Sequence, residues 1–533
     1  MRPGRLLLWI LAAILVPLAL ALGWRALFVN EPAVPATLPV PLDTSAFDGA
    51  IEALAPERAA RLDALTAGLG LAGLVDALAG GEASASELVA FSARRVRAHD
   101  PILGAVIALD PAALAEAARL DALAAEGRSA GPLHGVPVLV KDNVATGGGL
   151  ATTVGAAALA GHRPPADAPV VARLREAGAV ILGKTNLSEW AYFMSTRAPS
   201  GYSAVGGPTV NPFGRDLAVL GSSSGSAVAV AARFAPLALG TETTGSIVAP
   251  AAANGIAGMR PSTGLLDDAL IAPIATALDG AGPMARRVAD LALALDVLAG
   301  PGHGFVAALD GALDGAPSST ATLEGVRLGM PVVGGLRPGT VGGEPFGAAV
   351  AALEAAGATV VEAIVPDAAA QALAAAQLPL FAGRMARDTD AWLAATGAPI
   401  DSLADVVAWN ARDPDALAPH GQDLLELTVA ARTTDDEHAE LVARYRSTAL
   451  GAIESLAREH GLDALLSVDN LFSLFYAGAG VAAVVLPIGR DASGQPRGAT
   501  LVAVRPDDDA ALLRLAHAVE RVAGRLEDPL AGR

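Results

Sequence analysis

The chain contains no cysteine and almost no lysine. The absence of cysteine from its 533 residues excludes disulfides, thiolate catalysis, cysteine-ligated zinc and lipoprotein attachment. Of the 37 basic residues, only Lys141 and Lys184 are lysines, and the other 35 (37 − 2) are arginines. A guanidinium stays protonated, whereas a desolvated amine can lose its proton and act as a base. The two lysines are therefore candidates for chemistry.

Positive charge is scarce overall, with a formal net charge of −18 and a pI of about 4.9. No stretch of clustered Lys and Arg with interleaved aromatics occurs, which argues against a nucleic-acid partner. The sequence also lacks a His-Glu-x-x-His zinc motif and a glycine-rich G-x-x-x-x-G-K phosphate loop. We therefore expect no metal ion and no other cofactor.

Apolar segments are abundant, and hydrophobic residues make up 53% of the chain. Apolar runs predict strands at 136–140, 179–182, 217–220, 237–239, 359–365, 462–468 and 500–504. Amphipathic stretches and caps predict helices at 87–99, 110–126, 166–177, 346–356, 433–461 and 507–526. The Gly- and Pro-rich segment 301–343 predicts irregular surface. Alternating strands and helices indicate an α/β fold with a sheet covered on both faces, in one large domain over 47–530.

The first residues predict export. Arg2 and Arg5 precede an uncharged apolar run at 6–22, which is followed by Trp24. Two interpretations of residues 1–29 stay open: a cleaved signal peptide, or an anchor that contacts the cytoplasmic membrane. Residues 30–46 are rich in proline and predict a stiff tether. Either way we expect a periplasmic or extracellular protein.

Two serine-glycine segments lie downstream of the lysines: Gly221-Ser-Ser-Ser-Gly-Ser226 and Gly240-Thr-Glu-Thr-Thr-Gly-Ser246. A neutral Lys141 at the end of a buried strand can take a proton from a hydroxyl, which in turn activates a second serine. The backbone N–H groups of Thr243, Thr244 and Gly245 precede Ser246 and can converge on an oxyanion. This nucleophile system needs neither histidine nor metal.

These segments resemble the amidase signature family, whose motif runs approximately G-G-S-S-G-G-S, then G-T-D-x-G-G-S-I-R-x-P-A. The family's nucleophile and its bridging serine are 24 residues apart, as are Ser246 and Ser222 (246 − 222 = 24). The similarity runs from about residue 87 to the C-terminal helix. It is nearest to the bacterial peptide amidases, which share Gly-Ser-Ser-Ser-Gly-Ser and Gly-Thr-Glu-Thr. The resemblance implies the family's fold, a single large domain around a mixed, twisted sheet with helices on both faces.

The resemblance also implies a role for each residue. Lys141 would be the general base, and Ser222 the bridging serine, held by a cis peptide bond. Ser246 would attack the carbonyl of a small-molecule or peptide amide. The N–H groups of Thr243 to Ser246 would hold the oxyanion, with Ser223 as a neighbouring hydrogen-bonding residue. The Lys141 nitrogen must then lie out of solvent and close to the serine hydroxyls.

Departures from the family pattern bear on the substrate. Val248 stands where many members have an arginine that binds an anionic substrate, so a carboxylate-bearing ligand is disfavoured. Thr244 replaces a glycine, or the aspartate of peptide amidases, beside the oxyanion hole. The segment 467–470 replaces a Pro-Thr pair in a region that commonly lines the substrate pocket. An uncharged amide, such as a C-terminal peptide amide, is the expected substrate.

Alternatives remain for the whole chain and for single residues. Gly221 to Gly225 matches the G-x-S-x-G elbow of an α/β-hydrolase, in which Ser223 would need a histidine and an aspartate. A catalytically inactive, membrane-tethered binding protein on the amidase fold is the other alternative. Lys184 is either a structural partner of a carboxylate or carbonyl, or a positioning residue. Asp279 is either a turn residue or a site residue.

Overall fold

A computed structural model describes residues 39–309, 322–524, 526 and 528–530. The predicted leader at 1–29 and most of the tether at 30–46 lie outside the described residues. Within the described part of the chain, no helix is long and apolar enough to cross a membrane.

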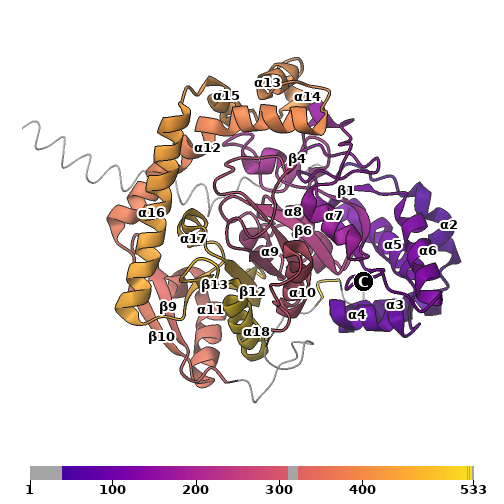
Figure 1. The fold of residues 1–533 in the computed structure, drawn as a ribbon, viewed down its shortest axis with the longest axis horizontal. Helices are drawn as coiled ribbons and strands as arrows, with labels where there is room; N and C mark the ends of the chain where they lie inside the picture. The colour runs from indigo at the N-terminus through magenta and orange to yellow at the C-terminus, as the bar shows by residue number, and fades with distance from the viewer. Residues whose placement is uncertain (1–38, 310–321, 525, 527, 531–533) are drawn as a thin grey trace, which may run out of the picture.

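An 11-stranded mixed sheet runs through the molecule in the order β1-β3-β2-β6-β8-β7-β12-β13-β11-β9-β10 (Figure 1). Strand β2 is parallel to both of its neighbours, β3 and β6, whereas the strands from β6 to β11 pair antiparallel. The strands are β1 (Val106–Leu109), β2 (Pro137–Lys141), β3 (Val180–Thr185), β6 (Leu237–Glu242), β7 (Ala257–Arg260), β8 (Gly280–Ala285), β9 (Arg327–Val332), β10 (Thr359–Ile364), β11 (Ala464–Val468), β12 (Ala483–Arg490) and β13 (Pro496–Ala503). The expected single α/β domain with a central mixed sheet is confirmed.

Two groups of helices pack on the sheet, and within each group the helices contact one another. Helices α8 (Ser224–Ala231) and α9 (Val248–Ala253) pack on β6, β7 and β12. Helices α10 (Val288–Ala299), α11 (Pro338–Ala355) and α18 (Asp509–Ala523) form the other group. The N-terminal helices, indigo to violet in Figure 1, lie at the β1 end: α2 (Asp48–Ala53), α3 (Pro56–Gly68), α4 (Leu71–Ala79), α5 (Ala85–Leu103) and α6 (Ala113–Ala125), with α7 (Pro169–Glu176) against β3.

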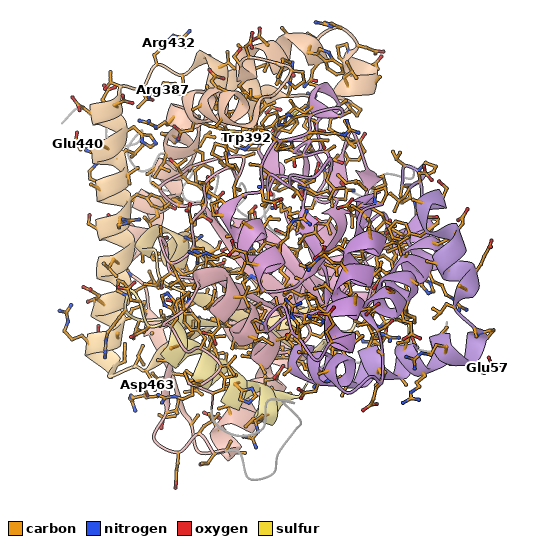
Figure 2. All side chains as sticks on the ribbon, turned by 45° about the vertical axis from the view of Figure 1, so that its right-hand side comes forward. Glu57, Arg387, Trp392, Arg432, Glu440 and Asp463 are labelled. Carbon is orange, nitrogen blue, oxygen red and sulfur yellow. The ribbon has the colours of Figure 1, made fainter. Side chains whose placement is uncertain are left out.

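A set of helices between β10 and β11 extends beyond the sheet (Figure 1). It comprises α12 (Asp367–Thr396), α13 (Leu403–Asn410), α14 (Pro414–Leu417), α15 (Asp423–Ala430) and α16 (Asp435–His460), followed after β11 by α17 (Ser473–Ala479). In Figure 2, Glu440 lies in the N-terminal part of α16 and Asp463 just beyond its C-terminal end, and Trp392 of α12 lies in the interior. The Trp392 indole N–H donates to the Leu270 carbonyl at 3.2 Å, so α12 is fixed to the loop between β7 and β8.

Local signals explain where two long helices begin and end. Helices α5 and α16 each start with a capping box, formed by Ser84 with Glu87 and by Thr434 with Glu437. Each helix ends at a glycine in the left-handed region, with φ of 59° at Gly104 and 63° at Gly461. The predicted helix at 433–461 is thereby confirmed almost to the residue.

The structure corrects three predictions. Residues 217–220 form no strand, because the segment turns at Leu220, with φ of 51°, into the next loop. Strand β9 and the start of α11 lie inside 301–343, which the sequence predicts to be irregular. Helix α6 begins at Ala113 rather than at the proline after Asp110, whose carboxylate accepts the Ala112 N–H at 3.0 Å.

Candidate active site

The carboxyl ends of two parallel neighbours, β2 and β6, bring Lys141 beside the end of β6, which the second serine-glycine turn follows. Strand β2 ends at Lys141 and β6 ends at Glu242, and Val140 pairs with Leu239 between them. Because the strands run in the same direction, their ends open at one edge of the sheet, where ligands bind in open α/β folds. Lys141 lies beside Thr241 at this edge.

The Lys141 amine is buried and directed at a serine. Its side chain is 0% exposed, and Nζ lies 2.8 Å from Ser222 Oγ. Nζ also lies 2.9 Å from Thr241 Oγ1 and 3.2 Å from the Thr241 carbonyl oxygen. Asn143 Nδ2 donates to Thr241 Oγ1 at 2.9 Å, which holds Thr241 from a second side. The structure thus brings Lys141 and Ser222 into direct contact.

Burial lowers the pKa of Lys141 from 10.5 to about 7, against the opposing effect of the Glu242 and Asp279 carboxylates. Desolvation disfavours the charged ammonium, and none of the described carboxylates forms an ion pair with it. A substantial fraction of the amines is therefore neutral at neutral pH, with a lone pair that can accept a proton.

Ser222 lies in a tight turn that leads into helix α8. The Gly221–Ser222 peptide bond is cis, as the family resemblance implies. The Ser222 carbonyl accepts the Ser188 N–H at 3.1 Å. A Cβ on Gly221 would collide with the Ser188 hydroxyl, so glycine suits the close approach of these two segments.

Ser223 is fully buried, and its hydroxyl is already committed to β6. Its Oγ donates to the Thr241 carbonyl at 3.0 Å and accepts the Thr241 N–H at 3.2 Å. Among the described residues, no histidine hydrogen-bonds to Ser223. These contacts suit a supporting residue and leave the α/β-hydrolase alternative without its base.

Residues 243–246 form the turn between β6 and α9. Gly245 has a φ of 90°, a conformation that residues with side chains rarely adopt. The Ser246 carbonyl accepts the Ser223 N–H at 3.1 Å, which ties the two serine-glycine turns together. In the described structure the N–H groups of Thr244, Gly245 and Ser246 donate to no protein acceptor. They are available for a developing oxyanion.

Two carboxylates hold this turn in place. Glu242 Oε2 accepts the N–H groups of Ile247 and Val248 at 2.7 and 3.0 Å, at the start of α9. Asp279 Oδ1 accepts the Thr243 hydroxyl at 2.5 Å. Asp279 Oδ2 accepts the backbone N–H groups of residues 274 and 275, both at 2.9 Å. Asp279 thus combines the turn role and the site role that the sequence left open.

The positions that depart from the family motif each have a defined neighbour. Thr244 Oγ1 accepts a hydrogen bond from Gln377 Nε2 of α12 at 3.2 Å. A Cβ on Gly245 would lie 3.1 Å from Asn470 Nδ2, so the altered segment 467–470 abuts the predicted nucleophile turn. Val248 is fully buried at the start of α9, where its side chain lines no part of the neighbouring cavity.

Lys184 makes a different set of contacts from Lys141. Its Nζ donates to the Val144 carbonyl at 2.5 Å and to Thr146 Oγ1 and Thr152 Oγ1 at 3.0 and 3.1 Å. Asp142 Oδ1 lies 3.9 Å away. These contacts fit the structural-partner interpretation of Lys184, which braces the loop after β2.

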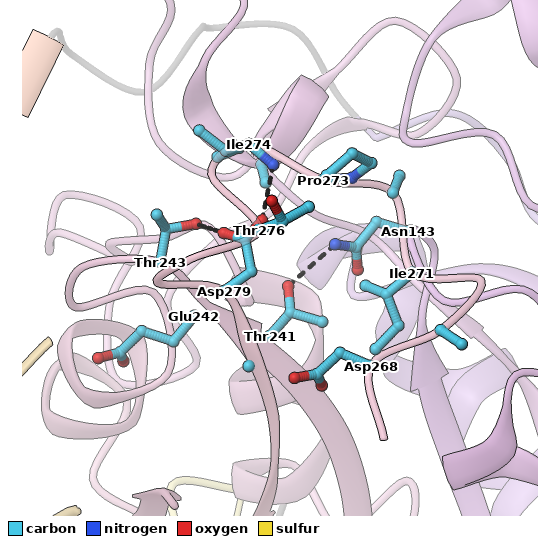
Figure 3. Close-up of a pocket in the computed structure, with 14 residues that line it drawn as sticks. Asn143, Thr241, Glu242, Thr243, Asp268, Ile271, Pro273, Ile274, Thr276 and Asp279 are labelled. Atoms are coloured by element: carbon cyan, nitrogen blue, oxygen red, sulfur yellow. Dashed lines mark hydrogen bonds between the residues drawn. The ribbon is translucent and has the colours of Figure 1, made fainter. Parts of the chain in front are cut away.

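A cavity of about 240 Å³ adjoins the site (Figure 3). Thr241, which accepts a hydrogen bond from Lys141, and Asn143, which donates one to Thr241, form part of the cavity wall. Of the predicted substrate-binding residues, Thr243 lines this cavity, whereas Ser223, Thr244, Gly245 and Val248 do not. The other lining residues are Ala191, Glu242, Asp268, Ala269, Ile271, Ala272, Pro273, Ile274, Thr276, Asp279 and Gly280.

Comparison with known proteins identifies the family of the chain. Residues 87–513 match the family described as Amidase. The chain belongs to the amidase family. A probable amidase of Arabidopsis thaliana is 32% identical over 467 residues, which are 82% of this chain and 86% of that protein. Membership of the family makes the chain a hydrolase that acts on amide bonds.

Two solved structures share the fold over most of their length. The peptide amidase from Stenotrophomonas maltophilia is 37% identical, with a TM-score of 0.77 over 86% of this chain and 98% of that one. An amidase family protein from Bacillus anthracis str. Ames is 30% identical, with a TM-score of 0.83 over 93% of this chain and 100% of that one. The predicted family and the predicted likeness to peptide amidases are confirmed.

Proposed function

We propose that the chain cleaves a carboxamide C–N bond through a seryl acyl-enzyme, with Lys141, Ser222 and Ser246 as the catalytic residues. The observation that carries this proposal is the buried Lys141 amine, 2.8 Å from Ser222 Oγ, with its pKa lowered to about 7. The tie between the Ser223 N–H and the Ser246 carbonyl supports it, because it sets the turn of Ser246 beside that of Ser222.

In the proposed reaction, neutral Lys141 takes the Ser222 hydroxyl proton while Ser222 takes the proton of Ser246. Ser246 Oγ then forms a bond to the amide carbonyl carbon, and the negative oxygen is held by the N–H groups of residues 243–246. The C–N bond breaks as Ser222 passes its proton to the departing nitrogen and recovers one from Lys141. Water then cleaves the acyl-enzyme by the same relay and regenerates Ser246.

The proposed substrate is an amide without negative charge, such as a C-terminal peptide amide. Val248 supplies no positive charge to a carboxylate, and no basic side chain of the described residues lines the cavity. The similarity to the Stenotrophomonas maltophilia peptide amidase supports a peptide or small-molecule amide. We also propose that the enzyme is exported, which rests on the arginine-flanked apolar run at 6–22.

Turnover of a panel of primary amides by three variants tests the catalytic roles. Ser246→Ala should abolish turnover, and Lys141→Ala should lower kcat/KM by several orders of magnitude, about 10³-fold or more. Lys141→Arg should not restore it, because a guanidinium cannot give up its proton. Wild-type turnover in Lys141→Arg would refute the base assignment, and a wild-type enzyme that forms no Ser246 adduct with a fluorophosphonate would favour the inactive binding protein.

A further inference from the structure

The cavity beside the site is lined by three carboxyl groups: Glu242, Asp268 and Asp279. They do not have the same freedom to bind a ligand. Both oxygens of Asp279 accept hydrogen bonds from the protein. Glu242 Oε2 caps helix α9, and the buried Glu242 Oε1, which has no hydrogen-bond partner among the described residues, belongs to a carboxylate that interacts with the Tyr476 hydroxyl. Asp268 Oδ1 accepts the Ala281 N–H at 2.8 Å, whereas its second oxygen accepts no hydrogen bond from any described residue. Asp268 therefore presents an open acceptor.

A second acceptor in the same wall has no partner. Asn143 is 1% exposed and lines the cavity (Figure 3). Its Nδ2 is bound to Thr241, and its Oδ1 has no hydrogen-bond partner among the described residues. A buried carbonyl oxygen without a donor is unfavourable, so a donor supplied by a ligand would be bound there with a net gain.

Two basic side chains near the cavity, those of Arg260 and Lys141, do not point into it. Arg260 lies behind the wall, where NH1 donates to the Glu242 carbonyl at 3.2 Å and NH2 to the Leu278 carbonyl at 2.9 Å. Arg260 does not line the cavity, and the Lys141 amine is occupied by Ser222 and Thr241. The cavity thus offers hydrogen-bond acceptors and negative charge, and it lacks a cation among the described residues that could neutralise them.

We propose that this cavity binds a cationic, donor-rich group of the substrate, an ammonium or a guanidinium, through the carboxylate of Asp268 and the side-chain oxygen of Asn143. The inference rests on the proposed amidase function and narrows its substrate. The amide that reacts is uncharged, and a substituent of the same molecule carries the positive charge. Charge-assisted hydrogen bonds of this kind are roughly twice as strong as neutral ones.

The preference of the cavity for a cationic over a neutral substituent should depend on pH, because Asp268 attracts a cation only when it is ionised. Burial, with smaller contributions from the Asp279 and Asp267 carboxylates, raises the pKa of Asp268 to about 7, against the opposing effects of the Ala281 N–H and Arg260. The carboxyl is protonated below this pH and ionised above it. A guanidinium stays charged throughout, so the preference for it should increase from pH 6 to pH 8. Lys141 titrates in the same range but affects charged and neutral amides alike, so the ratio of their rates cancels its contribution.

The test compares N-acetyl-argininamide with N-acetyl-citrullinamide, which have nearly the same shape but differ in charge. We expect a kcat/KM ratio of about 10- to 100-fold in favour of the arginine compound at pH 8. The Asp268→Asn variant keeps an acceptor for Ala281 and should reduce the ratio toward one. Asp267→Asn is the matched control, because Asp267 is the exposed neighbour that does not line the cavity, and it should leave the ratio within about twofold.

Binding of both compounds to Ser246→Ala, measured by calorimetry, separates the two proposals. Tighter binding of the arginine compound without turnover by the wild-type enzyme would refute the proposed function and keep the inference. Equal binding and equal turnover of the two compounds would overturn the inference and keep the proposed function. An unchanged ratio in Asp268→Asn, or no binding of either compound, would also overturn it.

Discussion

The two lysines show how partners decide the chemistry of a buried amine. Both are 0% exposed. Lys184 is surrounded by three oxygen acceptors and has Asp142 within ion-pair distance. Lys141 has Thr241 and Ser222 as its partners, and none of the described carboxylates lies within 4.0 Å of it. Equal burial therefore leaves Lys184 as a brace and makes Lys141 able to exchange its proton with a serine.

At the residue scale, Gln377 should position residues 243–246, the proposed oxyanion-binding turn, through Thr244. The Gln377→Ala variant removes the donor to Thr244 Oγ1 and should lower kcat by about 2- to 10-fold, with little change in KM. Thr244→Gly removes the acceptor, so adding Gln377→Ala to that variant should have no further effect. A double-mutant cycle of kcat measures this coupling. Fully additive effects of the two changes would contradict a positioning role for Gln377.

The proposed catalytic residues are visible in the sequence, whereas the residues that support them are not. Lys141, Ser222 and Ser246 carry local signals, namely a rare amine after an apolar run and hydroxyls between glycines. Gln377 and Asp268 come from a helix and a loop far from those motifs in sequence, and each resembles many other polar residues on the chain. Their proximity to the site is a property of the folded chain, so no local pattern could have identified them.

At the scale of the element, helices and strands with strong local sequence signals were predicted, and those without such signals were missed. The strands at 136–140 and 237–239 were predicted because apolar runs there end in glycine or polar residues. Helix α12 was missed because alanines surround its axis on all sides and Pro379 interrupts the pattern, so no apolar stripe stands out. The boundaries of α16 were predicted because Thr434 and Gly461 are strong start and stop signals.

The capping box of α16 leads to a stability prediction. Thr434 Oγ1 accepts the Glu437 N–H at 3.2 Å, and Glu437 Oε2 accepts the Thr434 N–H at 2.9 Å. Thr434→Ala should lower the free energy of unfolding by about 1 kcal/mol. Ser447→Ala, at an exposed position inside the same helix, is the control and should change it by less than about 0.5 kcal/mol. Urea unfolding of both variants measures these changes. Equal losses of the free energy of unfolding in the two variants would contradict a stabilising role of the cap.

At the scale of the whole molecule, the net negative charge bears on which partners the chain attracts, and the apolar run at 6–22 bears on the proposed export. A net charge of −18 keeps like molecules apart and does not favour anionic partners. Residues 1–29 carry Arg2 and Arg5 before the apolar run at 6–22 and Arg25 after it. Basic residues ahead of such a run are typical of the export segment that we propose.

Export is testable with residues 1–46 fused to a reporter that protects the host only from outside the cytoplasm. In a Gram-negative host, the fusion should confer β-lactam resistance with a β-lactamase reporter, and replacing three leucines of the run at 6–22 by arginine should abolish it. Cell fractionation of the full-length protein distinguishes a cleaved signal, which releases the enzyme, from an anchor, which keeps it with the membrane. A fusion that leaves the host sensitive would contradict export.

The central claim, that a neutral Lys141 activates Ser246 through Ser222, is tested most directly by the pH dependence of serine labelling. The second-order rate of fluorophosphonate labelling should rise about tenfold per pH unit below pH 7 and level off above it, because only the deprotonated amine is a base. Mass spectrometry should place the adduct on Ser246. A rate that is flat from pH 5 to pH 9, or the same pH profile in Lys141→Ala, would contradict the mechanism.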